Sequence, residues 1–234
     1  MIDEFIDKRI KSADELIMRN LLGLEPHTTP KIVDGDVVLT YGRSHVVEEA
    51  LKYAHSLNTK FRVVVVDSRP RLEGRGLLKS LAEHGIQCTY VLLSAVSYVM
   101  KDVTKVILGA AAMMANGTAL SRVGTAVVAM MAHTLRRPVI FCCETYKFSE
   151  RVQMDGIVSN EVADPSDLIK DKDGRATLLE GWEEVDHMGV LNLSYDLTPQ
   201  EFITVIVTDV GNIPTTSVPV IIREFIAEGV LDDQ

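Results

Sequence analysis

Cysteine, tryptophan and positive charge are all scarce in this sequence. The three cysteines, Cys88, Cys142 and Cys143, lie in apolar segments, and none has the spacing of a zinc site. A low, odd count is typical of a reducing compartment, and we interpret each cysteine as a small buried hydrophobe. Acidic residues outnumber basic ones by 33 to 24, a formal net charge of -9. This balance argues against a general nucleic-acid surface and favours protein or small-molecule partners.

Several common motifs are also missing. The sequence contains no G-x-G-x-x-G fingerprint and no Walker loop, and Glu73–Gly76 has the wrong spacing for either. The six histidines form no H-x-x-x-H pair. No uninterrupted apolar run reaches the roughly 20 residues that a membrane helix needs, and Met1–Glu4 is acidic rather than signal-like. We therefore expect no cofactor, no metal, no membrane contact and a cytosolic protein.

Apolar runs alternate with helical patterns along most of the chain. The runs lack strict alternation, which is typical of strands buried on both faces of a parallel sheet. Strands are predicted at 36–41, 61–66, 86–93, 104–108 and 139–143, with further short ones at 154–158 and 190–193. These alternate with helices, so the predicted fold is α/β, a doubly wound, mainly parallel (Rossmann-like) sheet flanked by helices.

The two ends of the chain have simpler patterns. Residues 2–22 have the apolar spacing of an amphipathic helix, and we assign residues 1–30 to this helix and its connector. Residues 31–234 are predicted to form one structural unit, with an exposed loop at 165–181. For 198–207, a single helical turn followed by a strand is one interpretation that the sequence leaves open.

The stretch 109–160 contains a run from Ala119 to Leu135 that is apolar on nearly every side. We interpret this run as one helix. A helix that is apolar all round is buried, either in a core or between subunits. Its small residues permit close approach of another backbone, and its methionines suit an irregular surface. The plain core and the subunit interface both remain open.

Arginines gather where the predicted strands end. In a parallel sheet these ends share one edge, where ligands commonly bind. The arginines are residues 43, 69, 71, 75 and 122. Such a cluster could hold a phosphate, or its members could pair with local carboxylates such as Asp67 and Glu73. Of the titratable groups at this edge, only Asp67 and Glu144 could act as a base, and each lies beside basic residues that favour an ion pair.

Four segments together carry a family resemblance. They are VVVVDSRPRLEGR (63–75), ANGTALSRVGTA (115–126), CCETYKFSERVQMD (142–155) and YDLTP (195–199). They resemble the regulatory subunits of eukaryotic translation initiation factor 2B, and the first three are most similar to the delta branch. The family is related to methylthioribose-1-phosphate and ribose-1,5-bisphosphate isomerases. Members of the delta branch have a longer N-terminal part, so we expect this chain to be the C-terminal part of a longer protein.

The resemblance implies that this chain is not an enzyme. The isomerases' catalytic cysteine falls on Gly42 and their catalytic aspartate on Ala111. Their substrate-binding glutamine is replaced by Glu73, and their Asn-Lys pair falls on Ser121 and Arg122. Moving a proton or hydride between adjacent carbons needs positioned acid–base groups, which glycine and alanine cannot supply.

By resemblance, the expected role is that of a non-catalytic scaffold and regulatory subunit of the exchange factor for translation initiation factor 2. The implied partners are the beta, alpha, gamma and epsilon subunits, and initiation factor 2 with its phosphorylated alpha subunit. The expected interface residues are Val123, Val127, Met130, Met131, Cys142, Glu144 and Tyr146.

A vestigial crevice is expected to be lined by Arg43, Arg69, Arg71, Glu73, Asn116 and Arg122. Two alternatives stay open beside the scaffold. One is a module that senses a sugar phosphate or a nucleotide without converting it, which the arginines would permit. The other is an active sugar-phosphate isomerase, against which Gly42 and Ala111 argue.

Overall fold

A computed structural model describes residues 2–26, 28–153, 160–170 and 179–227 of the chain. Its main sheet has seven strands in the order β11-β10-β7-β4-β1-β2-β3. All neighbours are parallel except β11, which runs antiparallel to β10. The bounds are β1 Val37–Tyr41, β2 Arg62–Asp67, β3 Gln87–Leu92, β4 Lys105–Gly109, β7 Val139–Cys142, β10 Val205–Thr208 and β11 Gly211–Ile213. The predicted doubly wound, mainly parallel sheet is confirmed, whereas the strand expected at 154–158 lies outside the described residues.

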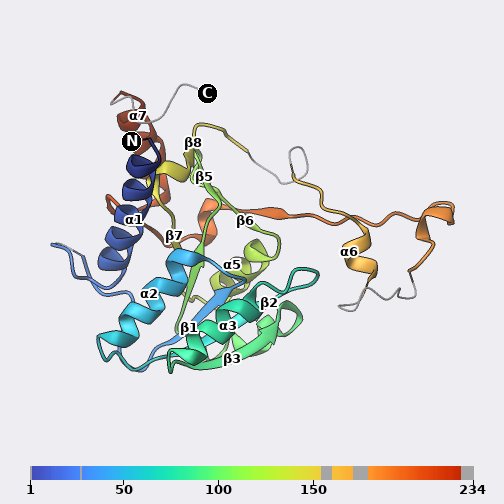
Figure 1. Cartoon of the computed structure of the whole chain (residues 1–234), viewed down its shortest axis with the longest axis horizontal. Helices are drawn as coiled ribbons and strands as arrows, with labels where there is room; N and C mark the ends of the chain where they lie inside the picture. Colours follow the sequence, from blue (N-terminus) through green and yellow to red (C-terminus); the bar gives the residue numbers. More distant parts are fainter. Residues whose placement is uncertain (1, 27, 154–159, 171–178, 228–234) are drawn as a thin grey trace.

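Helices cover both faces of this sheet (Figure 1). One face carries α1 (Ile2–Leu21), α2 (His45–Ser56) and α3 (Gly74–Glu83), and the other carries α4 (Val96–Val99), α5 (Thr125–Thr134) and α7 (Val218–Ala227). Within β2, Val63 and Val65 pack toward the first set of helices, and Val64 and Val66 toward the second. Because both faces are buried, the strand is apolar throughout rather than alternating. No described helix is long and apolar enough to cross a membrane.

A second, smaller sheet corrects the prediction for the central stretch. Its order is β8-β5-β6-β9, with β5 Ala112–Met114, β6 Ala119–Arg122, β8 Phe148–Ser149 and β9 Tyr195–Thr198. The helix predicted over 119–135 was wrong at its start, because residues 119–122 form strand β6, which pairs antiparallel with β5 on one side and β9 on the other. The helix begins only at Thr125, after Gly124 takes a left-handed φ of 105°.

The part of the chain that comprises residues 160–170 and 179–194 projects from the body of the molecule (Figure 1). It contains the short helix α6 (Ser166–Ile169), within the stretch where only a loop was expected. The strand predicted at 190–193 is reduced to a single bridge between Val162 and Leu193. The segment after it follows the alternative of one turn and then a strand, with a short 3-10 turn at Gln200–Phe202 before β10.

Candidate functional site

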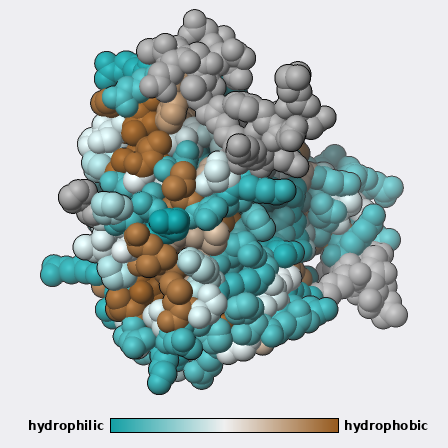
Figure 2. Space-filling view, turned by 60° about the vertical axis from the view of Figure 1, so that its left-hand side comes forward, coloured by the Kyte–Doolittle hydropathy of each residue, from teal (hydrophilic) through white to brown (hydrophobic). Residues whose placement is uncertain are grey.

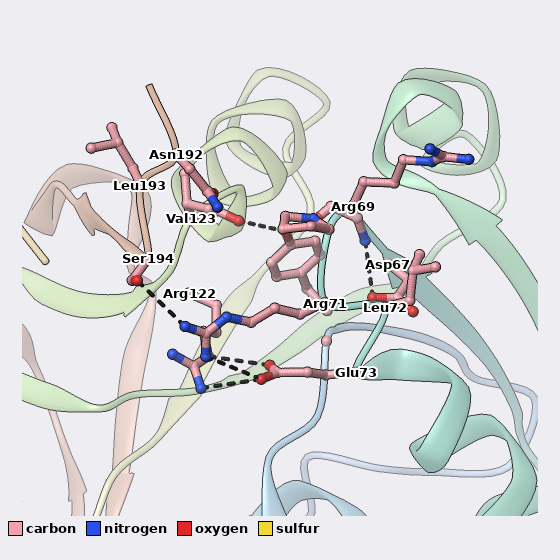
Figure 3. A pocket seen from close by; sticks show the side chains of 14 residues that line it. Asp67, Arg69, Arg71, Leu72, Glu73, Arg122, Val123, Asn192, Leu193 and Ser194 are labelled. Atoms are coloured by element: carbon pink, nitrogen blue, oxygen red, sulfur yellow. Dashed lines mark hydrogen bonds and ion pairs between the residues drawn. The ribbon is translucent and has the colours of Figure 1, made fainter. Parts of the chain in front are cut away.

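A pocket opens where β1 and β2 end, at the carboxyl edge of the main sheet (Figure 3). Its empty space is about 370 Å³, part of which is open to solvent. Its wall includes the loop that follows β2, the end of β6, and the segment that leads into β9. The lining residues are Tyr41, Gly42, Asp67, Ser68, Arg69, Pro70, Arg71, Leu72, Glu73, Arg122, Val123, Asn192, Leu193 and Ser194.

Two arginines of the pocket converge on one carboxylate, that of Glu73 (Figure 3). Nε and Nη2 of Arg122 each donate to a different Glu73 oxygen at 3.1 Å, a bidentate pair. Nη1 of Arg71 lies 3.7 Å from Glu73 Oε1, and its Nη2 donates to Ser194 Oγ at 3.5 Å. The Arg122 guanidinium also lies over the ring of Tyr195, 5.1 Å from its centroid. The site's charges are therefore largely satisfied from within the chain.

The remaining polar groups on the floor of the pocket are also engaged. The Tyr41 hydroxyl donates to the Val123 carbonyl and accepts from Ser68 Oγ at 2.6 Å. Burial raises the pKa of Tyr41 to about 12, so the phenol is neutral at pH 7. The buried Asp67 carboxylate accepts from the Ser68 N–H at 2.9 Å and from the Tyr90 hydroxyl at 3.0 Å. Asp67 is thus held as a structural acceptor, not aimed at a substrate.

The two positions onto which the resemblance places the isomerases' catalytic groups, Gly42 and Ala111, have no titratable side chain. Gly42 lines the pocket with a φ of 63°, and a Cβ built there would meet no atom within 4 Å. Ala111 is exposed, and its N–H donates to the Leu120 carbonyl in the pairing of β5 with β6. The space beside Gly42 is open, and neither Gly42 nor Ala111 supplies an acid or a base to it.

Four of the six predicted crevice residues, Arg69, Arg71, Glu73 and Arg122, line the pocket together. The other two do not. Arg43 donates from Nε to Glu48 at 2.9 Å, on α2. Asn116 forms the turn between β5 and β6, where its amide contacts Gln153 O and the Thr118 N–H, both at 3.2 Å.

Asp196, next to the pocket, organises the start of α5. Its Oδ2 accepts from the backbone N–H groups of Gly124 at 2.7 Å and Ala126 at 3.0 Å. Burial raises the pKa of Asp196 to about 6, although these two hydrogen bonds act in the opposite direction. A carboxylate of the chain itself therefore occupies the helix N-terminus, a place where anions commonly bind.

The predicted interface residues fall into two groups. On α5, the inner residues Val128, Ala129 and Ala132 are fully buried, whereas Val127 is 42 % and Met130 45 % exposed. The helix that is apolar on every side is therefore buried on one side only, and Met131 and Val123 are partly exposed. The second group, Cys142, Glu144 and Tyr146, offers little exposed surface. Cys142 is fully buried and Tyr146 is partly buried. The buried Glu144 pairs with Lys147 at 2.7 Å and accepts a hydrogen bond from the Tyr146 hydroxyl at 3.3 Å.

Sequence reasoning missed the contributions of Tyr41 and of residues 192–196. Only the YDLTP segment gave a signal, as part of the family resemblance. The pairing of β9 with β6 places Tyr195 opposite Arg122. An antiparallel register between segments more than 70 residues apart cannot be read from a local pattern.

Comparisons with known proteins agree with this geometry. The model of the initiation factor 2 subunit family matches residues 1–215. The chain belongs to this family. It is 49 % identical over 227 residues to translation initiation factor eIF2B subunit delta of Dictyostelium discoideum, covering 96 % of this chain and 35 % of that protein.

The chain is also similar to an isomerase and to a protein of known structure. Ribose 1,5-bisphosphate isomerase of Pyrococcus furiosus is 34 % identical over 194 residues, which is 83 % of this chain and 58 % of the isomerase. The tetrameric eIF2B-beta2-delta2 complex from C. thermophilum contains a chain that is 32 % identical, with a TM-score of 0.73, over 89 % of this chain and 59 % of that one. This chain thus spans only part of each of these relatives.

Proposed function

We propose that this member of the initiation factor 2 subunit family is a non-catalytic regulatory subunit of the cytosolic exchange factor for translation initiation factor 2. The observation that carries the proposal is the state of the former substrate pocket. Gly42 on the pocket wall and Ala111 outside its lining offer no acid or base, and Glu73 pairs with two of the pocket arginines. Because positioned acid–base groups contribute roughly 10²–10⁴-fold each, a pocket without them does not sustain isomerisation.

Pairing with a beta subunit is the second part of the proposal, and the outer side of α5 supports it. Val127 and Met130 expose apolar surface there, and α4, which packs against α5, adds Tyr98 at 78 % exposure. Adjoining exposed apolar residues of this kind mark interaction surfaces. The relative of known structure that assembles as beta2-delta2 has the same fold.

The apolar surface on the α1 side supports contacts with further subunits. Figure 2 shows apolar side chains gathered among hydrophilic ones on the face that comes forward from the left of Figure 1. Among the described side chains of α1 and of the connector after it, the exposed apolar ones are Ile10, Leu16 and Leu24. We propose that alpha, gamma and epsilon subunits complete the assembly, and that it senses the phosphorylated alpha subunit of initiation factor 2.

The pairing proposal is tested by Val127→Asp. A charge in a desolvated interface without a partner is costly, so we expect the variant to lose its one-to-one complex with a beta subunit in light-scattering mass measurements. Val33→Asp is a matched control, because Val33 has nearly the same exposure, 44 % against 42 %, but lies before β1. If the complex persists in Val127→Asp, or is lost equally in the control, α5 is not the pairing surface.

The sensor alternative draws its support from Arg69, which lines the pocket and has no ion pair among the described residues. The guanidinium of Arg69 alone would bind a phosphate more weakly than the three pocket arginines, 69, 71 and 122, would together. Calorimetry with ribose-1,5-bisphosphate, methylthioribose-1-phosphate and a nucleotide separates the two functions. Heat at submillimolar ligand would favour the sensor, and product formation would restore the isomerase.

A further inference from the structure

Helix α1 docks onto the main sheet through a side that is mostly apolar but also carries two buried polar groups. It packs against α2, β10 and β11, and Ile17 and Leu21 have no exposed surface. Asn20 donates from Nδ2 to the Thr208 carbonyl at 2.9 Å, which ties the end of the helix to β10. The other polar group is Asp14, whose side chain is only 14 % exposed. A carboxylate beneath a docked helix needs a partner, because burying an unpaired charge is costly.

Asp14 lacks the close cation that another buried carboxylate of this chain has. Asp36 pairs with Lys105 at 2.6 Å, and both of these side chains are largely buried. Oδ1 of Asp14 is also buried, but it receives no hydrogen bond from an N–H or a hydroxyl group of the described residues. Oδ2 lies 3.8 Å from Nε2 of His45, whose side chain is 75 % exposed and therefore screened by solvent. An exposed imidazole at this distance does not compensate for burying a full negative charge at Asp14.

A second carboxyl group, that of Glu144, meets Asp14 beneath the helix. A side-chain hydrogen bond joins the two groups, and the side chain of Glu144 is only 5 % exposed. Ionised carboxylates have acceptors but no donor, so this bond exists only when one of the two groups holds a proton. Nζ of Lys147 lies 2.7 Å from Glu144 Oε2, and the Tyr146 hydroxyl donates to Glu144 Oε1 at 3.3 Å. Both contacts favour the negative charge on Glu144, which leaves the proton on Asp14.

The titratable groups around this pair come from α2, from β7 with the turn after it, and from the end of β10: His45, Cys143, Tyr146, Lys147 and Asp209. Burial and the charge of Glu144 raise the pKa of Asp14 above its ordinary value of 3.8, and the two basic groups oppose this without reversing it. Burial also raises the pKa of Tyr146 and that of Cys143, so the phenol and the thiol stay neutral. Asp209 already accepts two hydrogen bonds from the turn, both at 2.7 Å. The proton on Asp14 is therefore set to leave as pH rises past the ordinary range of an aspartate.

We propose that helix α1 is docked through a proton shared by Asp14 and Glu144, and that the helix loosens when this proton leaves. Without the proton, two negative charges would touch beneath α1, and like charges repel strongly where water is excluded. Docking is therefore strongest below the unfolded-state pKa of about 3.8 and weakens as pH rises through the raised, folded-state value. Loosening would uncover the apolar side of α1, with Ile17 and Leu21, and would change the apolar surface that the molecule presents. This device is independent of the pairing surface on α5.

The test compares the intact chain with Asp14→Asn, in which the new amide can donate to Glu144 at every pH. The readout is hydrogen exchange of the α1 amides between about pH 4 and pH 8, expressed as protection relative to an unstructured peptide. We expect protection in the parent chain to fall at least about threefold relative to Asp14→Asn, because each pKa unit contributes up to about tenfold. NMR titration of the Asp14 carboxyl carbon should give a pKa above 3.8. Glu15→Gln is the matched control, because it removes the next carboxylate along α1 from an exposed position.

His45 is a competing source of the same pH dependence, because its ion pair with Asp14 would also strengthen in acid. His45→Gln separates the two sources. A fall in protection that persists in His45→Gln and in Glu15→Gln, and is absent from Asp14→Asn, supports the shared proton. The proposal is overturned if Asp14 titrates at or below 3.8, if the parent chain and Asp14→Asn lose protection in parallel, or if the fall disappears in either His45→Gln or Glu15→Gln. Should Asp14→Asn fail to fold, the NMR titration of the parent chain decides the matter by itself.

Discussion

Replacing Glu73 with glutamine removes the carboxylate on which two pocket arginines converge while keeping the size of the side chain. The side chains of Glu73 and Arg122 are 30 % and 35 % exposed, so solvent screens the pair. We therefore assign the pair no more than about 1 kcal/mol of folding free energy. In a domain of this size that loss lowers Tm by about 2–4 °C.

The same substitution should open an anion site. Hydrogen bonds to a charged group contribute about 1.5–3 kcal/mol each, and Arg71 and Arg122 would each have donors free. A dissociation constant near 1 mM corresponds to only about 4 kcal/mol, which two such bonds reach. At a phosphate concentration of about ten times that constant, the folded state gains about 1.4 kcal/mol. Glu73→Gln should thus rise in Tm by about 3–6 °C in roughly 10 mM phosphate.

The assay is thermal unfolding of both proteins with and without phosphate at constant ionic strength. Glu83→Gln is the control, because it also removes a carboxylate from an ion pair, with Lys79 at 3.8 Å, but on the exposed surface of α3 and outside the pocket. The chain with Glu73 intact should respond no more than the control. A phosphate response that is equal with and without Glu73 would refute the idea that this carboxylate occupies the site.

Two other predictions concern the start of α5. Because the folded-state pKa of Asp196 is raised to about 6, its contribution to stability is full below about pH 4 and is lost as pH rises through 6. Between pH 5 and 7.5 that loss amounts to about 1.4 kcal/mol. Asp196→Asn, which keeps the acceptor oxygen, should remove this decline, measured as the change in urea midpoint between pH 5 and 7.5, and an unaltered pH profile would contradict the assigned pKa. Gly124→Ala places a Cβ 2.3 Å from the Tyr41 hydroxyl at a left-handed φ, so it should cost about 2–4 kcal/mol in denaturant unfolding, whereas Gly189→Ala, with no atom within 4 Å of the added carbon, should change little.

Local chemistry alone was enough for the main sheet and for the absence of an acid or a base at residues 42 and 111. Runs such as residues 63–66 are apolar at every position, and this is what burial on both faces of a parallel strand requires. The α/β fold and most strands followed from that pattern. Glycine at 42 and alanine at 111 have no titratable group in any fold, so the absence of an acid or a base there needs no coordinates.

Only the tertiary structure decided how the site and the surfaces are arranged. Residues 119–122 look like the first turn of an apolar helix, but hydrogen bonds with β9, more than 70 residues away, make them a strand and bring Arg122 beside Tyr195. Tertiary structure also sets which arginine pairs with which carboxylate: Arg122 on β6 bonds to Glu73, and Arg43 after β1 bonds to Glu48 on α2. Composition marks α5 as apolar all round, but packing determines that one side is buried and the other exposed. Backbone propensity is encoded over a few residues, whereas register and partner choice depend on contacts between distant segments.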